Sequence, residues 1–244
     1  GVDLTTFSAF GTKSTTTQEP IMPVKIHGMP PSANAIGPCI LAAHAECGGL
    51  EMCNLMEGAH KTEAFSKINP YQHIPALEDG DFAIGESVAI LRYIALKYKP
   101  ELYPAAAGDF EACGTIDFAI DAFLGEVMKH HVGVVYTVFG FAPAPEDQAA
   151  STSALMAALD KWGKTFLKGK TYVLGDKLSI ADFKVVPFFW SAMCCEPKVP
   201  GFEVPAQIKE YVNNFFGAVE AAKIMKECGG FAIAEFAASK DALK

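Results

Sequence analysis

The most informative stretch of this chain is residues 74–87, which read IPALEDGDFAIGES. Pro75 has no N–H, so a strand that opens with it leaves the backbone of Ile74 free to pair with another molecule. Asp79-Gly80 between apolar residues is a strong signal for a tight hairpin. Glu86-Ser87 precedes a helical apolar pattern, which places Ser87 at a helix N-terminus, where free N–H groups attract a carboxylate. We therefore expect a strand edge that binds a small extended peptide with a carboxylate.

Three further stretches carry motifs around this one. They read VKIHGMPPSAN at 24–34, NLMEGAHKTEAF at 54–65 and LGDKLSIADF at 174–183. In this order and spacing, the four stretches resemble the glutathione S-transferases, in particular the phi-like, serine-type cytosolic class, over about residues 23 to 220. The resemblance implies a thioredoxin-like N-terminal domain, an all-helical C-terminal domain and glutathione as co-substrate.

The expected secondary structure agrees with that α/β plus all-α plan. Apolar spacing predicts strands at 23–27 and 51–55, helices at 35–46, 60–68 and 87–98, and a hairpin at 75–84. Helical spacing recurs over 109–139, 147–168, 179–194 and 205–226. We expect an N-terminal extension at 1–22, a glutathione-binding domain at 23–99, a proline-containing linker at 100–108 and a helical domain at 109–244.

Composition excludes several classes of protein. With 28 acidic and 20 basic residues the formal charge is −8, which argues against nucleic acid as a partner. The apolar run at 132–142 is too short to cross a bilayer, so we predict no membrane span. Seven cysteines without a CxxC motif suggest neither a disulfide framework nor a zinc site, and fit a reducing compartment.

The sequence is consistent with two cellular compartments. We expect a cytoplasmic protein, or one from a plastid or another organelle if the Ser/Thr-rich residues 1–22, which begin with Gly1, are the remnant of a transit peptide. An expression scar or a natural extension explains those residues equally well.

Ser32 is the candidate catalytic residue. From the residues alone, a serine after Pro30-Pro31 and before a helix is a helix cap or a turn residue. The resemblance implies instead that its hydroxyl donates a hydrogen bond to the sulfur of glutathione. Such a bond, with a helix N-terminus nearby, lowers a thiol pKa from about 8.5, at about 1.4 kcal/mol per unit. The thiolate then attacks an electrophile or a peroxide.

Cys39 is the competing candidate, because cysteine-type members of the superfamily use a loop cysteine. Its position, seven residues after Ser32, predicts a buried small hydrophobe inside the first helix. An alternative alignment on Gly37-Pro38-Cys39 would place Ile36 at the catalytic position and make the protein inactive.

The resemblance also implies a set of glutathione-binding residues. Glu86 and Ser87 would hold the γ-glutamyl group, and Ile74, before a cis Pro75, would pair with the cysteinyl backbone. The basic residues expected near the glycyl carboxylate are His60, Lys61 and His73. The chain departs from many relatives at Val88, where they have arginine, and it lacks the arginine that commonly follows the Ser-x-Asn turn.

A second-substrate pocket is expected along the helix at 109–139. Its candidate lining residues are Phe118, Phe123, Val135, Tyr136 and Phe139, although core packing explains most of them equally well. His130-His131 is not expected to bind metal, because adjacent helical residues point about 100° apart and no further ligand is identifiable.

Ser179-Ile180-Ala181-Asp182 predicts a capping box at the start of a central helix, so that Asp182→Ala would cost about 1–2 kcal/mol of stability.

Two functions follow from these observations. The first is a glutathione transferase that acts on small hydrophobic electrophiles or peroxides, most simply as a homodimer like its relatives. The second is a non-catalytic relative that serves as a binding or assembly subunit of a larger complex.

Overall fold

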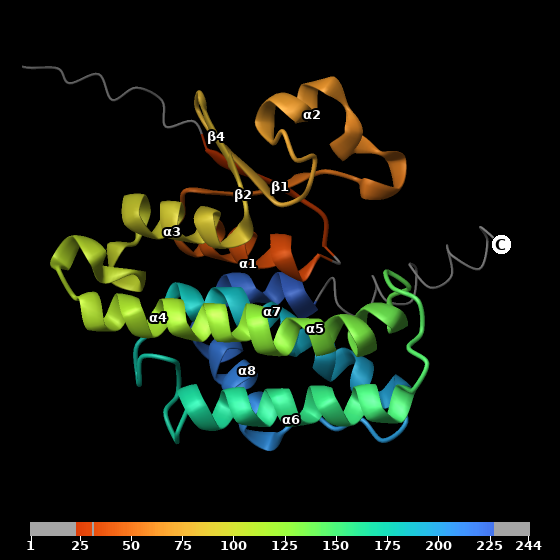
Figure 1. Cartoon of the computed structure of the whole chain (residues 1–244). Helices are drawn as coiled ribbons and strands as arrows, with labels where there is room; N and C mark the ends of the chain where they lie inside the picture. The colour runs from red at the N-terminus through yellow and green to blue at the C-terminus, as the bar shows by residue number, and fades with distance from the viewer. Residues whose placement is uncertain (1–22, 31, 227–244) are drawn as a thin grey trace, which may run out of the picture.

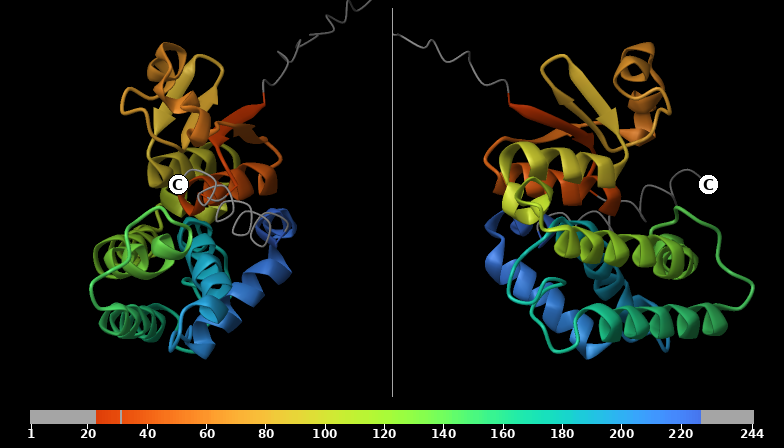
Figure 2. Two further views of the ribbon diagram at one scale, coloured as in Figure 1. Left: turned by 90° about the vertical axis from the view of Figure 1, so that its right-hand side faces the viewer. Right: turned by 60° about the vertical axis from the view of Figure 1, so that its left-hand side comes forward.

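The computed structural model describes residues 23–30 and 32–226 of the chain (Figure 1). The expected extension at 1–22 and residues 227–244 of the expected helical domain lie outside the described residues. The described chain forms a thioredoxin-like N-terminal domain and a helical C-terminal domain, as predicted (Figures 1 and 2).

The N-terminal domain is built on a mixed four-stranded sheet in the order β2-β1-β3-β4. β1 pairs in parallel with β2 and antiparallel with β3, which pairs antiparallel with β4. Helices α1 and α3 lie between the sheet and the helical domain, whereas α2 lies on the other side of the sheet (Figures 1 and 2). The elements are β1 (Val24–Gly28), α1 (Ala33–His44), β2 (Gly48–Met52), α2 (Glu63–Ile68), β3 (Ala76–Asp79), β4 (Phe82–Gly85) and α3 (Ser87–Tyr98).

The hairpin at residues 75–84 is confirmed, but β3 is not the edge of the sheet. Asp79 pairs with Phe82 across the two-residue turn, in which Gly80 has a φ of 61°. β3 has a partner on both sides, because β4 occupies the edge. The expected strand edge was therefore wrong, and the unpaired backbone lies at Ile74, before β3 begins.

Strand β2 lies three residues earlier than predicted. Gly48, which lies before the expected strand, pairs with Val24. A Cβ at Gly48 would lie 1.9 Å from the carbonyl oxygen of Val24, so this glycine permits close approach of β1.

The helical domain follows two short 3₁₀ helices, η3 (Pro100–Leu102) and η4 (Pro104–Ala107). Its first long helix comprises α4, α5 and two π-helical turns, a feature that is frequent at functional sites. The segments are α4 (Phe110–Ala122), η5 (Phe123–Val127), α5 (Met128–His131), η6 (Val132–Tyr136), α6 (Gln148–Phe166), α7 (Ile180–Cys195) and α8 (Ala206–Ala218).

Helix α7 is the centre of the core and begins with the predicted capping box. The buried Asp182 carboxylate accepts hydrogen bonds from the Ser179 N–H at 2.6 Å and from the Tyr211 hydroxyl at 2.6 Å. α7 also approaches α1 closely, because a Cβ at Gly37 would lie 2.3 Å from the carbonyl oxygen of Phe183. Glycine at position 37 therefore allows the contact between the two domains.

Among the described residues, no helix is both long and apolar enough to cross a membrane.

Candidate active site

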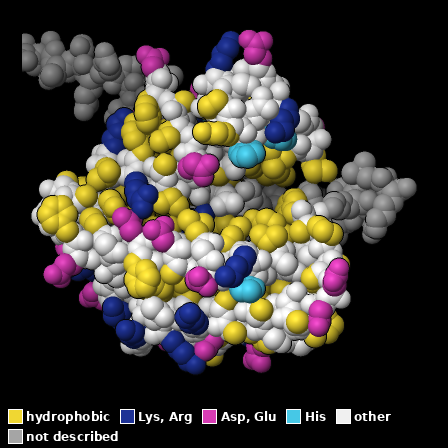
Figure 3. Space-filling model, viewed as in Figure 1, with side chains coloured by type: hydrophobic (Ala, Val, Ile, Leu, Met, Phe, Trp, Pro, Cys, Tyr) yellow, Lys and Arg dark blue, Asp and Glu magenta, His cyan; other side chains and the backbone are white. Residues whose placement is uncertain are grey.

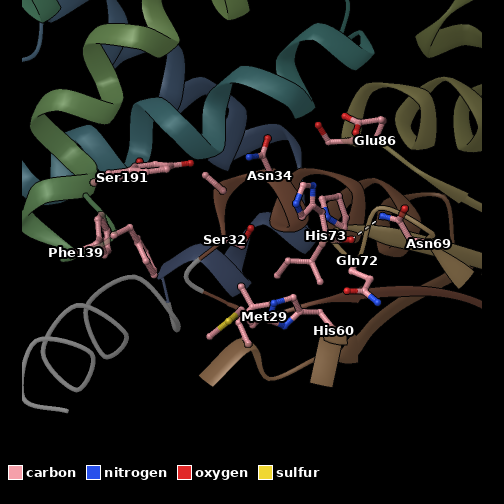
Figure 4. A pocket seen from close by; sticks show the side chains of 17 residues that line it. Met29, Ser32, Asn34, His60, Asn69, Gln72, His73, Glu86, Phe139 and Ser191 are labelled. Carbon is pink, nitrogen blue, oxygen red and sulfur yellow. Dashed lines mark hydrogen bonds between the residues drawn. The ribbon is translucent and has the colours of Figure 1, made fainter. Parts of the chain in front are cut away.

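A cavity of about 470 Å³ lies between the two domains. On the surface it is a hollow with histidine side chains above it and hydrophobic side chains along its lower rim (Figure 3). In Figure 4, Ser32 lies between the aromatic side of the pocket, with Phe139, and the side formed by His73 and Asn69. The lining residues are Met29, Ser32, Ala33, Asn34, Leu55, His60, Asn69, Gln72, His73, Ile74, Pro75, Glu86, Ser87, Tyr136, Phe139, Phe141 and Ser191.

Ser32 occupies the N-cap position of α1 without capping it through its side chain. Its carbonyl oxygen accepts from the N–H groups of Ala35 and Ile36, both at 2.9 Å, as the first turn of the helix requires. Its hydroxyl forms no hydrogen bond with any described residue, although it lines the cavity. The Ser32 hydroxyl can therefore donate to a ligand, and the N-terminus of α1 favours negative charge there.

Glu86 and Ser87 lie side by side at the start of α3. Glu86 adopts a φ of 64°, an unfavourable conformation for a residue with a side chain, and its exposed carboxylate forms no hydrogen bond with the described chain. Ser87 is buried, and its hydroxyl oxygen accepts a hydrogen bond from Lys184 at 2.9 Å. The pair presents an acceptor and a helix N-terminus to the same cavity, a combination that fits an amino acid headgroup.

The segment before β3 contributes Ile74 and Pro75 to the cavity. The peptide bond between them is cis, as predicted. Neither backbone polar group of Ile74 is paired within the described chain. A backbone N–H and carbonyl left open beside a cavity can pair with an extended peptide.

The three predicted basic residues lie around one end of the cavity. His60 and His73 line it, whereas Lys61 lies beside it and donates to the carbonyl oxygen of Gln72 at 3.5 Å. The pKa of His60 is lowered by burial and by the positive charges of Lys61 and His73. A bound anion would relieve this repulsion, so the cluster suits a carboxylate.

The helical domain provides an aromatic side of the cavity. Tyr136 and Phe139, two of the expected second-substrate residues, line it together with Phe141 and Ser191. Ser191 is held by the fully buried His131, whose Nε2 lies 3.1 Å from both the Ser191 hydroxyl and the Phe188 carbonyl oxygen.

The other predicted second-substrate residues lie elsewhere. Phe123 and Val135 are buried in the core, and Phe118, 60% exposed, lies against Phe166 on another face. Their helical spacing is the same as that of Tyr136 and Phe139, so the pattern alone could not separate them.

Sequence reasoning missed several residues of the cavity. Asn34 ends the recognised motif at 24–34 and Asn69 lies between the motifs at 54–65 and 74–87, but no role was assigned to either. Asn69 donates to the His73 carbonyl oxygen at 2.8 Å, and a Cβ at Gly85 would lie 2.8 Å from its amide nitrogen. Lys184 was missed altogether, although a charged residue within the apolar run FKVVPFFW at 183–190 is a visible anomaly.

The cysteines of the described chain are poorly suited to nucleophilic chemistry. Burial raises the pKa of Cys39 to about 12, and this side chain is 3% exposed inside α1. Burial likewise raises the pKa of Cys47 to about 11 and that of Cys195 to about 12. A nucleophilic cysteine needs the opposite shift.

His131, one half of the His130-His131 pair, serves packing. Burial lowers its pKa to about 4, so the ring is neutral near pH 7. Within the described chain, no group of three or more His, Cys, Asp or Glu residues could hold a metal ion.

Comparison with known proteins agrees with this geometry. Residues 22–96 match the family of glutathione S-transferase N-terminal domains, and residues 116–218 match that of the C-terminal domains. Glutathione S-transferase theta-1 of Bos taurus is 33% identical over 146 residues, which cover 56% of this chain and 59% of that protein. Glutathione S-transferase 3 of Zea mays is 33% identical over 177 residues, which cover 66% of this chain and 74% of that protein.

A solved structure shows the same fold. The structure of a delta-class glutathione transferase of Nilaparvata lugens has a TM-score of 0.74 at 24% identity, covering 88% of this chain and 99% of that one. The matches to the theta-class protein span only 59% of its length, so they leave its activity and substrates as hypotheses for this chain. Both domain families and the maize relative nevertheless cover most of the fold, and the chain belongs to the glutathione S-transferase family.

Proposed function

We propose that this protein is a glutathione transferase that activates the glutathione thiol for conjugation to small electrophiles or for reduction of peroxides. The observation that carries the proposal is the Ser32 hydroxyl, which lines the cavity at the N-terminus of α1 and has no partner within the described chain. A donor in this position stabilises a thiolate rather than a thiol.

The proposed mechanism assigns the nucleophile to glutathione. The Ser32 O–H donates to the sulfur, and the partial positive charge of the helix N-terminus adds to this stabilisation. The thiolate attacks an electrophilic carbon and displaces a leaving group or adds to a polarised double bond. With a hydroperoxide it attacks an oxygen and releases an alcohol, and a second glutathione completes the reduction to a disulfide and water.

Binding of glutathione is assigned to three parts of the cavity. Glu86 would accept from the γ-glutamyl ammonium, and Ser87 would donate to its carboxylate. The Ile74 backbone would pair with the cysteinyl residue. The glycyl carboxylate would lie among the basic residues His60, Lys61 and His73.

The aromatic side of the cavity supports a hydrophobic second substrate. Tyr136, Phe139 and Phe141 come from the helical domain and line the cavity that Ser32 also lines. A substrate that contacts these rings would place its electrophilic atom near the sulfur, so aryl halides and organic hydroperoxides are the substrate classes to test.

A homodimer is part of this proposal. Phe110 is 77% exposed on α4, and Phe118 on the same helix is 60% exposed. Large apolar side chains exposed on one helix are typical of a surface covered by a partner, and sedimentation velocity would measure the mass of the assembly.

Calorimetric titration with glutathione, followed by turnover assays with an aryl halide and an organic hydroperoxide, tests this function. We expect binding and measurable conjugation. Binding without turnover on either substrate class would favour the non-catalytic alternative, and absence of binding would overturn the proposal.

A further inference from the structure

Lys184 is a buried cation directly behind the cavity. It comes from α7 of the helical domain, and its side chain is 2% exposed. Its Nζ donates to the Asn34 side-chain oxygen at 2.7 Å and to the Ser87 hydroxyl oxygen at 2.9 Å. Both acceptors line the cavity, and they come from the first turns of α1 and α3.

The charge of Lys184 has no direct anionic partner. None of the ion pairs within 4.0 Å in the described chain includes Lys184. Its ammonium lies 4.8 Å from the centre of the Phe188 ring, and Glu86 acts on it only as a more distant charge. A buried cation without a carboxylate partner is unfavourable unless a nearby anion compensates it.

Lys184 also determines how its two partners orient their hydrogen atoms. An ammonium can only donate, so the Asn34 oxygen must face Lys184 and the Asn34 NH₂ group is left for another acceptor. The Ser87 oxygen accepts from Lys184, so its own O–H must point elsewhere. Neither donor has a partner within the described chain, which leaves both available to an anion in the cavity.

We propose that Lys184 is the positioning residue of a carboxylate subsite, where it orients the Ser87 hydroxyl and the Asn34 amide as donors and provides the positive charge behind them. The inference rests on the proposed function, in which the anion is the α-carboxylate of the γ-glutamyl group. A ligand carboxylate then accepts from Ser87 and Asn34, while Lys184 compensates its charge through both of them.

Protonation of Lys184 should therefore control binding at this subsite. Burial lowers its pKa to about 8, and Glu86 opposes this shift. Most of the other titratable groups on the elements packed around Lys184 have partners of their own. Asp182 is bound to Ser179 and Tyr211, His131 on α5 to Ser191, Asp117 on α4 to Arg92, Lys97 on α3 to Asp79, and Lys209 on α8 to Glu196. His44 on α1 lies against the Phe183 ring, and Glu111 and Asp121 on α4 and Glu210 on α8 form no ion pair within the described chain. Glu86 is the charge that acts on the Lys184 pKa.

The test compares wild type with Lys184→Met, which keeps the length of the side chain and removes its charge. The ligand is S-methylglutathione, because it has no thiol whose ionisation could affect the titration. At pH 7 the variant should bind at least about tenfold more weakly. Lys164→Met is the matched control, since Lys164 is an exposed lysine of α6 that pairs with Asp160, and its loss should leave affinity unchanged.

The pH profile separates a charge effect from general distortion. Wild-type affinity should fall relative to Lys184→Met as pH rises above about 8, because the free protein loses the Lys184 proton there. Ionisation of the ligand amine affects both proteins equally and cancels in the ratio. A ratio that stays constant from pH 7 to pH 9.5 would overturn the proposal.

Two S-methylated analogues identify the carboxylate. The glutaryl analogue, glutaryl-cysteinyl-glycine, keeps the α-carboxylate and lacks the amine, whereas the 4-aminobutyryl analogue keeps the amine and lacks the carboxylate. Lys184→Met should weaken binding of the first and leave binding of the second within about twofold. Equal losses of affinity for the two analogues in Lys184→Met would contradict the proposed carboxylate subsite. If wild type binds none of these ligands, the proposed function fails instead, and the two failures are distinguishable.

Discussion

The ammonium nitrogen of Lys184, in the helical domain, lies 2.9 Å from the hydroxyl oxygen of Ser87, the first residue of α3 in the thioredoxin-like domain. The contact exists because α7 passes close to α1 at Gly37. A residue of the second domain thereby reaches the proposed ligand-binding segment of the first. Helix α7 therefore both packs the two domains together and places Lys184 beside the candidate site.

Lys184→Met should stabilise the protein near neutral pH. Burial lowers the Lys184 pKa from 10.5 to about 8, so the native state binds fewer protons than the unfolded state between those values. The free energy of unfolding of the wild type therefore rises with pH between about 8 and 10.5. Below pH 8 the buried ammonium lowers it by about 3 kcal/mol. Urea unfolding at pH 7 should give a larger free energy of unfolding for Lys184→Met than for wild type, and the difference should be smaller at pH 10. Identical pH slopes in the two proteins would contradict this account.

Asp182→Ala should destabilise the fold by more than the loss of a helix cap. Besides Ser179 and Tyr211, the buried carboxylate accepts from the Val173 N–H at 3.3 Å. Removing it leaves several buried donors unpaired, so we expect a loss of about 3–5 kcal/mol in urea unfolding rather than the 1–2 expected of a cap. Asp182→Asn, which keeps part of the acceptor capacity, should lose less. A free energy of unfolding equal to that of the wild type in Asp182→Ala would refute the assignment of Asp182 as a stabilising hydrogen-bond acceptor.

Glu86→Ala and Ser87→Ala should each weaken glutathione binding by about tenfold or more. Each removes one charge-assisted hydrogen bond, worth about 1.5–3 kcal/mol, from the proposed γ-glutamyl site. Ser153→Ala, on the exposed surface of α6, provides a control serine. Unchanged affinity of both site variants in calorimetry would show that the site is placed wrongly.

Cys39 should take no part in the reaction. Its pKa of about 12 and its burial in α1 predict that iodoacetamide does not modify it in the native protein at pH 8. Cys39→Ala should keep conjugation activity within a few-fold. Loss of activity in this variant, with Ser32 intact, would instead support a cysteine-type mechanism.

Much of this structure could be predicted from the sequence. The two-domain plan, the hairpin, the cis bond before Pro75 and the capping box all rest on short local motifs with a definite geometry. The position of β2 was missed because a glycine pair signals a turn in sequence, whereas here Gly48 permits close contact with Val24. Local pattern cannot distinguish the two uses of glycine.

The site was less predictable where it depends on contacts between distant residues. Ser32, Glu86 and Ser87 lie in local motifs, but Lys184 is 97 residues from Ser87 and 150 from Asn34. Tyr136 and Phe123 share one helical pattern, yet one lines the cavity and the other lies in the core. Only the packing of the two domains separates them.

The pKa of the glutathione thiol bound to this protein tests the central claim most directly. It can be measured from the pH dependence of thiolate absorbance in the complex, for wild type and for Ser32→Ala. We predict a wild-type pKa at least about one unit below the free value of about 8.5, and a return toward that value in Ser32→Ala with affinity changed only a few-fold. A wild-type thiol that titrates like free glutathione, or the same lowered pKa in both proteins, would contradict the assignment of Ser32.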